Sequence, residues 1–204
     1  MAAPVYSAGT PGNLINYVSV AASKNAAAFL DLSTSIEGQL TCETIVGSSA
    51  PTGLTTFSAY KAYAAGSSAP ITLSASATAG ATSLTVSSKT GLSVGQTVCL
   101  QQAGGAKLGE LSKITAISGS SSPYTLTVGA MINSYSFGDY LYLMAQTASF
   151  AVAPASTSGT YSPSTDYSSE LFLGPGQWIV AASNADSSVS ITANATYDRI
   201  TAIA

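Results

Sequence analysis

Alternation of apolar and polar residues with a period of two is the feature that most constrains the fold of this chain. It recurs in short runs rich in β-branched and aromatic residues, such as 14–20, 39–46, 54–63 and 188–197. Runs of this length, bounded by clusters of Gly, Pro, Asn and Ser, are typical of strands. The helix-favouring stretch around 24–28 is too short to be stable by itself. The sequence therefore predicts an all-β protein.

Residues 71–145 contain an internal duplication. The tripeptide Leu-Thr-Val at 84–86 recurs at 126–128, and the segment 92–100 recurs as 135–143. The offset between the two copies is 42 residues for the tripeptide and 43 residues for the longer segment, so the second copy has one additional residue between them. Each copy has the same order of a strand, a linker, a tight turn and a second, alternating strand. This shared order favours duplication over chance similarity.

The turn of each copy has the pattern Ser-Φ-Gly-polar, where Φ is Val94 in the first copy and Phe137 in the second. Gly95 and Gly138 occupy the same place, as expected for a turn that needs a positive φ angle. Two strand-turn-strand units cannot each bury an apolar face alone. We therefore expect them to interlock into a small β-barrel of about six strands with few free edges.

The predicted strands on either side of the duplicated segment do not show its repeated strand-turn-strand pattern. Together, residues 14–70 and 146–204 predict a discontinuous antiparallel β-sandwich that is jelly-roll-like, with the barrel of 71–145 inserted into one of its loops. Residues 1–13, which are small and contain Pro and Gly, predict an extended N-terminal arm. The alternative is two barrels in a row, with 14–70 as a short separate domain.

Charge is scarce, and its scarcity excludes several functions. Only 7% of the residues are charged, with 6 Lys plus Arg, 9 Asp plus Glu and no His, for a formal net charge of −3. Without His, Ser–His–Asp and Cys–His pairs and imidazole metal sites are excluded. So few basic residues cannot neutralise a run of phosphates, and no segment approaches the ~20 apolar residues of a membrane helix. We expect neither nucleic acid nor a membrane as a partner.

The same composition favours a permanent assembly. A surface of Ser, Thr, Ala and Tyr costs little to desolvate, and tyrosine is enriched at protein interfaces whereas Lys and Glu are depleted there. A rigid β protein with a neutral surface is the alternative. The aromatic candidates for partner binding are Tyr6, Tyr60, Tyr63, Tyr140, Tyr142 and Trp178. Cross-strand pairing on half-exposed sheets is the alternative role of the tyrosines.

Carboxylates are the remaining candidates for chemistry, because glycoside hydrolysis needs only two. No recognisable motif surrounds any of them, and we expect no catalytic residue, no metal and no cofactor. A calcium site formed by Asp166, Glu170, Asn184 and Asp186 is the alternative. Turn chemistry alone accounts for Asn184 and Asp186.

The two cysteines, Cys42 and Cys99, both lie within alternating, strand-like runs. This placement predicts small buried thiols. A disulfide between them stays open, although two distant cysteines do not argue for one. The chain starts without a basic segment followed by a long apolar one, so we expect synthesis in a cytoplasm.

Two parts of the chain resemble virion proteins of tailed bacteriophages. The run 80–98, followed by 109–110 and 114–119, is similar to small β-modules of such proteins, and 171–184 continued by 195–197 is similar to strands of head-decoration and tail-associated β-sandwiches. The resemblance covers about half of the chain. It implies a non-enzymatic, symmetric, usually trimeric subunit on a capsid or tail, and it carries over no catalytic residue.

These observations lead to one principal expectation and two alternatives. The principal expectation is a capsid decoration (cement) protein on the capsid surface, which binds the major capsid protein, forms a homotrimer and uses its N-terminal arm as a contact. The first alternative is a tail, fibre or baseplate protein, or an adhesin whose inserted barrel recognises host glycan. The second is a hydrolase that uses a pair of carboxylates.

Overall fold

The computed structural model describes residues 6–8, 12–35, 37–46, 53, 55–63, 70–103, 109–152 and 166–202. The described residues form antiparallel strands and no helix, so the predicted all-β class is confirmed. Within them, no helix has the length and apolar character that crossing a bilayer requires. Two compact units divide the chain: Met1–Ala59 with Thr147–Ala204, here called the sandwich unit, and Tyr60–Gln146, here called the barrel unit.

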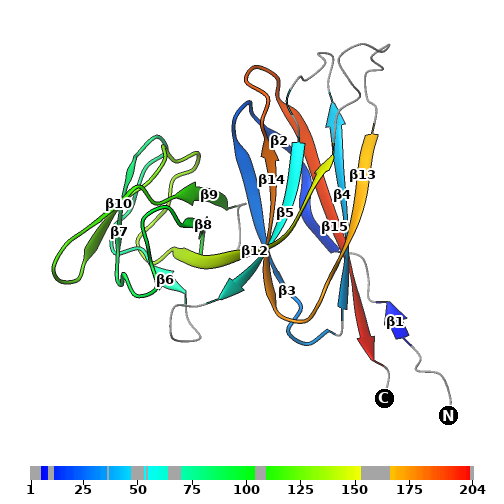
Figure 1. The fold of residues 1–204 in the computed structure, drawn as a ribbon, viewed down its shortest axis with the longest axis horizontal. Helices are drawn as coiled ribbons and strands as arrows, with labels where there is room; N and C mark the ends of the chain where they lie inside the picture. Colours follow the sequence, from blue (N-terminus) through cyan, green and yellow to red (C-terminus); the bar gives the residue numbers. More distant parts are fainter. Residues whose placement is uncertain are drawn as a thin grey trace. The chain divides into compact units, whose positions relative to one another are not determined.

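The strands follow one another without intervening helices (Figure 1). In chain order they are β1 (Tyr6–Ala8), β2 (Gly12–Val20), β3 (Asn25–Asp31), β4 (Glu37–Val46), β5 (Thr55–Tyr63), β6 (Ile71–Thr72), β7 (Ser83–Val86), β8 (Thr97–Gln101), β9 (Glu110–Lys113), β10 (Ala116–Ser118), β11 (Tyr124–Thr127), β12 (Tyr140–Val152), β13 (Asp166–Leu173), β14 (Gln177–Asn184) and β15 (Ile191–Ala202).

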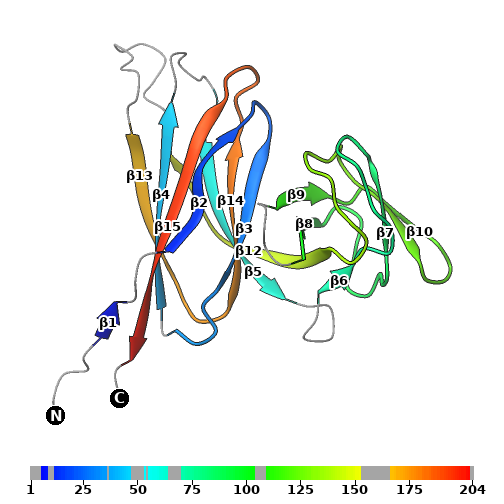
Figure 2. The ribbon, with the colours of Figure 1, turned by 180° about the vertical axis from the view of Figure 1, so that it is seen from behind.

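The sandwich is a jelly roll. One sheet has the order β2-β15-β4-β13, and the other has the order β3-β14-β5-β12. Among these eight strands, β2 pairs with β15, β3 with β14, β4 with β13 and β5 with β12. This is the pairing of a long hairpin that is rolled up into two layers. Figure 2 shows the two layers from behind. This arrangement of eight strands in two sheets is the jelly-roll architecture, in agreement with the predicted class.

Strict alternation places the core of the sandwich between its sheets. On β4 up to Ile45 and on β15 from Ile191 to Ala195, every second side chain is buried, and those between them are half-exposed, apart from the buried Asn194. The period of two that marks these runs in the sequence is thus the period of burial. The buried positions of the two strands are Leu40, Cys42, Thr44, Ile191, Ala193 and Ala195.

Strand β1 lies within the segment that the sequence predicts as an extended arm. Tyr6, Ser7 and Ala8 pair with Ala202, Thr201 and Ile200 of β15. Strand β2 begins at Gly12 and pairs with the same edge of β15 further along. The N-terminal strand thus extends the chain's own sheet.

The two copies of the duplication interlock about an approximate two-fold axis. In the ladder of β7 and β11, Leu84 pairs with Leu126, the same position of the other copy. In the ladder of β8 and β12, Cys99 pairs with Tyr142, which are again equivalent. Each ladder is therefore centred on a residue and its own counterpart, as a two-fold axis between the copies requires.

The turns repeat the same symmetry. Gly95 N–H donates to the Ile114 carbonyl at 2.8 Å, and Gly138 N–H donates to the Leu73 carbonyl at 2.9 Å. Both glycines have positive φ angles, 90° and 88°, as the Ser-Φ-Gly pattern predicts. Each copy thus holds the turn of the other in place, because these hydrogen bonds run between copies.

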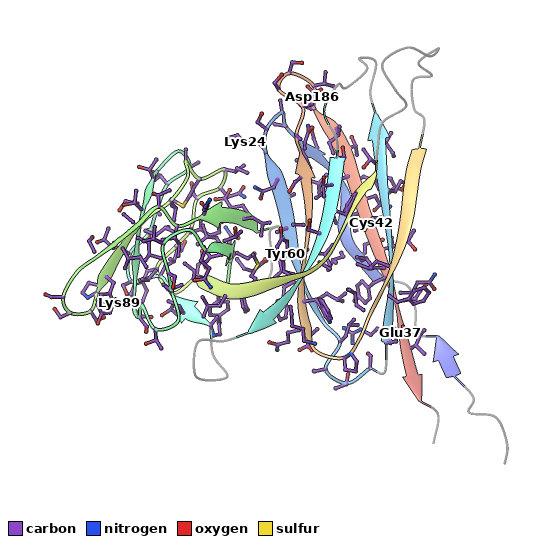
Figure 3. All side chains as sticks on the ribbon, in the orientation of Figure 1. Lys24, Glu37, Cys42, Tyr60, Lys89 and Asp186 are labelled. Atoms are coloured by element: carbon purple, nitrogen blue, oxygen red, sulfur yellow. The ribbon has the colours of Figure 1, made fainter. Side chains whose placement is uncertain are left out.

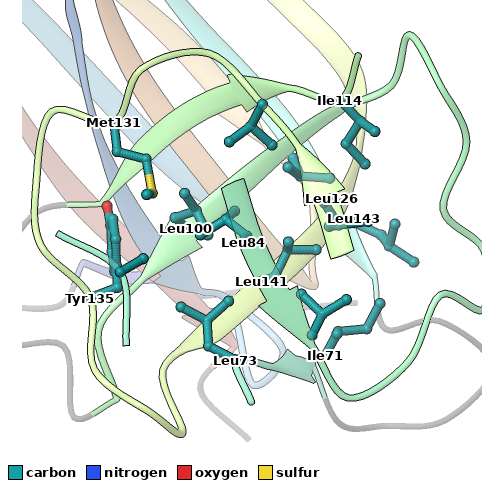
Figure 4. Packing of buried hydrophobic residues seen from close by; sticks show 14 residues of the cluster. Ile71, Leu73, Leu84, Leu100, Ile114, Leu126, Met131, Tyr135, Leu141 and Leu143 are labelled. Carbon is teal, nitrogen blue, oxygen red and sulfur yellow. The ribbon is translucent and has the colours of Figure 1, made fainter. Parts of the chain in front are cut away.

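The barrel has a single apolar core that both copies fill (Figure 4). Fourteen of its side chains are shown there, and those from the two ladders point toward one another. The core comprises Ile71, Leu73, Ala77, Leu84, Val86, Val98, Leu100, Ile114, Leu126, Val128, Met131, Tyr135, Leu141 and Leu143.

Candidate interaction surface

Tyr140 and Tyr142 are half-buried neighbours on β12. Their rings meet edge to face, with centroids 6.1 Å apart and planes at 73°. Leu141 between them points into the barrel core, so both tyrosines lie on the outer side of the strand. Burial, the neighbouring Tyr140 and Cys99 raise the pKa of Tyr142 above its ordinary value of 10.0. The pair thus combines partly accessible rings with polar hydroxyl groups.

The other aromatic candidates have different surroundings. Tyr60 on β5 is half-buried, whereas Tyr6 and Tyr63 lie in strands whose side chains at those positions are outside the described residues. Trp178 is only 5% exposed, and its indole N–H donates to the Gly174 carbonyl at 2.8 Å. Its ring is packed within the sandwich and its one donor is used. Trp178 is therefore a core residue rather than part of a partner-binding surface.

Asp186 is buried in the loops at one end of the sandwich (Figure 3). Its Oδ1 accepts from the backbone N–H groups of Ser188 and Val189, both at 2.7 Å, and its Oδ2 accepts from Gly53 N–H at 2.9 Å. The neighbouring Asn184 donates its amide to the carbonyls of Val20, Ala21 and Val189. These contacts are those of loop-fixing residues, as turn chemistry predicts.

The two acidic residues of the barrel unit are buried as well. Glu110 Oε2 accepts from the N–H groups of Ile132 at 2.6 Å and Asn133 at 3.3 Å. Asp139 accepts from Ser136 N–H at 2.8 Å and Ala103 N–H at 2.9 Å. Each carboxylate thus fixes a loop of the barrel. Among the described residues, no group of three or more His, Cys, Asp or Glu side chains is arranged to hold a metal ion.

Three of the remaining carboxylates face outward from one sheet. Glu37 and Glu43 on β4 occupy half-exposed positions between the buried ones, and Asp198 on β15 pairs with Gln39, which is also outward. On β13, Asp166 and Glu170 stand at register positions opposite the outward Ile45 and Thr41. No Lys or Arg occupies an outward position on the described strands of this sheet. We call this outer side of β2-β15-β4-β13 the acidic sheet face.

Two exposed aromatic residues flank the acidic sheet face. Phe172 on the edge strand β13 is 56% exposed and pairs with the outward Gln39. Tyr17 on the opposite edge strand β2 is 57% exposed and has a φ of 48°. It lies in a β-bulge, because Val18 pairs with Ala193 and Ile15 with Ala195, which leaves both Asn16 and Tyr17 opposite Asn194. Bulges of this kind redirect side chains.

Sequence reasoning missed this face. Its signal was present in the phase of the alternation, because the polar positions of 39–46 and 188–197 are those that carry the outward carboxylate and amide groups. The bulge at Tyr17 had no signal of that kind. A positive φ at an aromatic residue follows from the pairing with β15 and not from local sequence preference.

The Φ positions of the two copies are also exposed. Val94 is 62% and Phe137 is 74% exposed, at the second residue of each Ser-Φ-Gly turn. Because the turns precede β8 and β12, which run antiparallel, they lie at opposite ends of that ladder. They therefore form two separate apolar points and not one patch.

Both cysteines are free thiols in the cores of their units, Cys42 in the sandwich and Cys99 in the barrel. Burial raises the pKa of each thiol far above its ordinary value of 9.0, and Glu110 adds to the effect at Cys99. The thiolate, which is the nucleophilic form, is thus disfavoured at both positions.

No protein-family model matches the chain, and no curated protein matches it. Among solved structures, the chain is similar to VP17, a capsid protein of bacteriophage P23-77, at 11% sequence identity and a TM-score of 0.16, with 96% of this chain and 95% of that chain covered. A TM-score of this size does not relate two folds.

Proposed function

We propose that this chain is a structural protein of a bacteriophage virion, and specifically a capsid decoration protein. In this proposal it is not an enzyme; it binds the major capsid protein on the outer surface of the head and stabilises the shell, and it self-associates as a homotrimer. The sequence resemblance to phage virion β-modules supports the class. The jelly roll supports it as well, since viral capsid domains commonly have this architecture.

The observation that carries the proposal is the use made of the carboxylates. Three carboxylates are buried and accept hydrogen bonds from backbone N–H groups, and they fix loops in this way; they are those of Glu110, Asp139 and Asp186. The outward ones lie on a sheet face with polar neighbours and two exposed aromatic residues. Such a division favours rigid scaffolding and surface contact over acid–base chemistry, which needs carboxylates aimed into a shared site.

The physical mechanism is mass action. A protein that binds the assembled shell and not its dissociated subunits stabilises the shell by the free energy of that binding. Contact areas of standard size, repeated over many equivalent positions, add to a large total without any single tight contact.

The direct test asks where the chain lies on the virion and whether it stabilises the head. Purified virions should carry the chain on the head in numbers that match a repeated lattice position, as measured by quantitative mass spectrometry and cryo-electron microscopy. Adding the purified protein to undecorated heads should raise the temperature at which they release DNA. A location on the tail, or a release temperature that does not change with full occupancy, would refute the proposal.

The N-terminal segment provides a second test. Deleting residues 1–8 removes β1 and leaves the start of β2 intact, so we expect the sandwich to fold and the occupancy on heads to fall. Because β1 pairs with only three residues of β15, the loss of stability is expected to be small. Unchanged occupancy of a folded truncated protein would show that the arm is not a contact.

A glycan-binding role for the barrel is the second candidate, favoured by the half-exposed pair Tyr140 and Tyr142. Amphipathic aromatic rings suit sugar contacts. A glycan array with the full chain would test it. Specific binding that Tyr140→Ala or Tyr142→Ala abolishes, and that Tyr17→Ala in the other unit leaves intact, would favour an adhesin.

A further inference from the structure

Charge divides along the two units of the chain. The sandwich unit contains only two basic residues, Lys24 and Arg199, against seven acidic ones, which are Asp31, Glu37, Glu43, Asp166, Glu170, Asp186 and Asp198. The barrel unit reverses this balance, since it contains Lys61, Lys89, Lys107 and Lys113 against Glu110 and Asp139. Both barrel carboxylates are buried and accept backbone hydrogen bonds, so the outer charge of the described part of the barrel unit comes from Lys61, Lys89 and Lys113.

The centre of the acidic sheet face has an acceptor without a donor. Asn194 faces outward from β15 yet is only 7% exposed. Its Nδ2 donates to Glu43 Oε2 at 2.9 Å, whereas its Oδ1 accepts no hydrogen bond from any described residue. Asp198 Oδ1, on the same face, is likewise shielded from solvent and accepts none from the part of the chain described. Buried acceptors of this kind are rare in folded proteins, and here two of them lie on one face without a compensating donor among the described residues.

The chemistry of the face selects a cationic donor. Glu43 and Asn194 present oxygen atoms side by side, with Asp198 on the same strand as Asn194. A lysine ammonium group brings three donors and no acceptor, together with the opposite charge. A neutral donor would not balance the negative charge of the carboxylates on this face. The face is thus complementary to lysine side chains.

Tyr17 and Phe172 supply the apolar part of the contact. Aromatic side chains are prominent among the residues that dominate binding energy at protein interfaces. The backbone of Tyr17 is held in a conformation that a bulky residue rarely adopts, and this conformation places its ring on the surface. The two rings stand on the edge strands at either side of the carboxylates.

We propose that the acidic sheet face of one copy binds exposed lysine side chains of the barrel unit of a second copy, Lys89 and Lys113 among them. The occupant is a second copy because the chain itself contains the complementary charge, in the unit that lacks exposed carboxylates among its described residues. A contact between two different surfaces of identical chains is head-to-tail and closes into a ring when the rotation allows. This inference rests on the proposed self-association and names the surfaces that produce it.

Sedimentation velocity of the full-length protein tests the proposal. We expect self-association at low ionic strength that weakens in about 0.5 M NaCl, where charges more than a few ångströms apart are screened. Glu43→Lys and Lys113→Glu should each raise the dissociation constant about tenfold, since each places like charges together. Lys24→Glu changes the same charge at an exposed position of the sandwich unit and should have no effect. Glu43→Gln, which keeps the acceptor for Asn194, should fall between wild type and Glu43→Lys.

Mixing the variants separates a head-to-tail contact from a symmetric one. Glu43→Lys retains an intact barrel and Lys113→Glu retains an intact sheet face, so an equimolar mixture should regain the association that each lacks alone. No recovery on mixing, an effect of Lys24→Glu as large as that of Lys113→Glu, or a protein that is monomeric at every salt concentration would overturn the inference. Occupancy on heads, measured separately, reports the proposed function and not this contact.

Discussion

Asp186 is the side chain on which the loops at one end of the sandwich depend. Its carboxylate binds Gly53 from one loop and Ser188 and Val189 from another, and its backbone carbonyl accepts from Ser23 N–H at 2.8 Å. Three chain segments distant in sequence therefore meet at one residue. The sequence predicts Asp186 as a turn residue but does not reveal the long-range contacts, because they arise only when the jelly roll brings the loops together.

Replacing Asp186 with Ala should lower the free energy of unfolding by about 3 kcal/mol, because it leaves three partly buried N–H groups without an acceptor. Asp186→Asn keeps one acceptor oxygen and should cost about half as much. Urea denaturation followed by tryptophan fluorescence measures both. A loss below about 1 kcal/mol for Asp186→Ala would contradict the role assigned to this carboxylate.

Asp31 provides the matched control at a half-exposed position. The Ser33 side chain and the Ser33 N–H, the latter at 2.9 Å, both donate to its carboxylate, and these contacts hold the pKa of Asp31 below its ordinary value of 3.8. Because the pKa is lower in the folded state, the stabilisation is complete above about pH 4 and is lost as the pH falls through the native pKa. Asp31→Ala should cost less than about 1 kcal/mol at neutral pH. Its stability should approach that of wild type in more acidic solution, and a gap that persists there would contradict this assignment.

Gly95 and Gly138 should respond alike to substitution. A Cβ at either position meets no atom within 4 Å, so the cost of Ala is that of the positive φ angle alone, about 1 kcal/mol. Gly174 has equally open space around a would-be Cβ and does not share the positive φ, and Gly174→Ala should change stability by less than about 0.5 kcal/mol. Thermal unfolding of the three variants measures the difference, and equal effects at all three would exclude the backbone explanation.

At the scale of elements, local patterning predicts the strands better than their ends. The runs 39–46 and 177–183 differ by one or two residues from β4 and β14, because both strands alternate cleanly between turns. The apolar residues within 109–117 indicate one bridging strand between the two copies. In the structure this run is interrupted at Ile114 and Thr115, where the chain leaves β9 for the hairpin of β10 and β11. Ile114 is fully buried there because it takes the place that Leu73 has in the first copy, which a single run cannot show.

Two strands are longer than their sequences predict. Strand β15 continues from Ile191 to Ala202, although 188–197 and 199–203 read as separate runs around Asp198. The charge at that position faces outward and does not end the strand. Strand β12 is continuous from Tyr140 to Val152, although its first residues belong to the barrel unit and its last to the sandwich unit. A boundary between units inside one strand leaves no mark in composition.

The pairing of Leu84 with Leu126 yields a prediction about the duplication. Both side chains are buried at the centre of the ladder of β7 and β11. Leu84→Ala and Leu126→Ala should each cost about 3 kcal/mol, and nearly the same amount, because they are the same position of the two copies. The double variant should depart from additivity by at least about 0.5 kcal/mol. Denaturant titrations of the four proteins test this, and strict additivity would show that the two side chains do not share a cavity.

At the scale of the whole molecule, each unit contains one buried thiol, which reports the opening of that unit. Single-thiol variants Cys42→Ala and Cys99→Ala should resist iodoacetamide in native buffer, since the remaining thiol is buried and its pKa is raised. With increasing urea, we expect Cys99 and Cys42 to become reactive at different concentrations, because each unit has its own core. Coincident midpoints would show that the two units unfold as one.

The position of the barrel within the rolled hairpin has a consequence for how this architecture changes over time. The chain leaves the jelly roll through β5 and returns through β12, and these two strands are neighbours in one sheet. The inserted segment therefore begins and ends at adjacent points, so its removal requires only a short reverse turn to rejoin the strands. A scaffold built in this way can gain, lose or exchange a whole cassette by recombination without disturbing the pairing of any other strand.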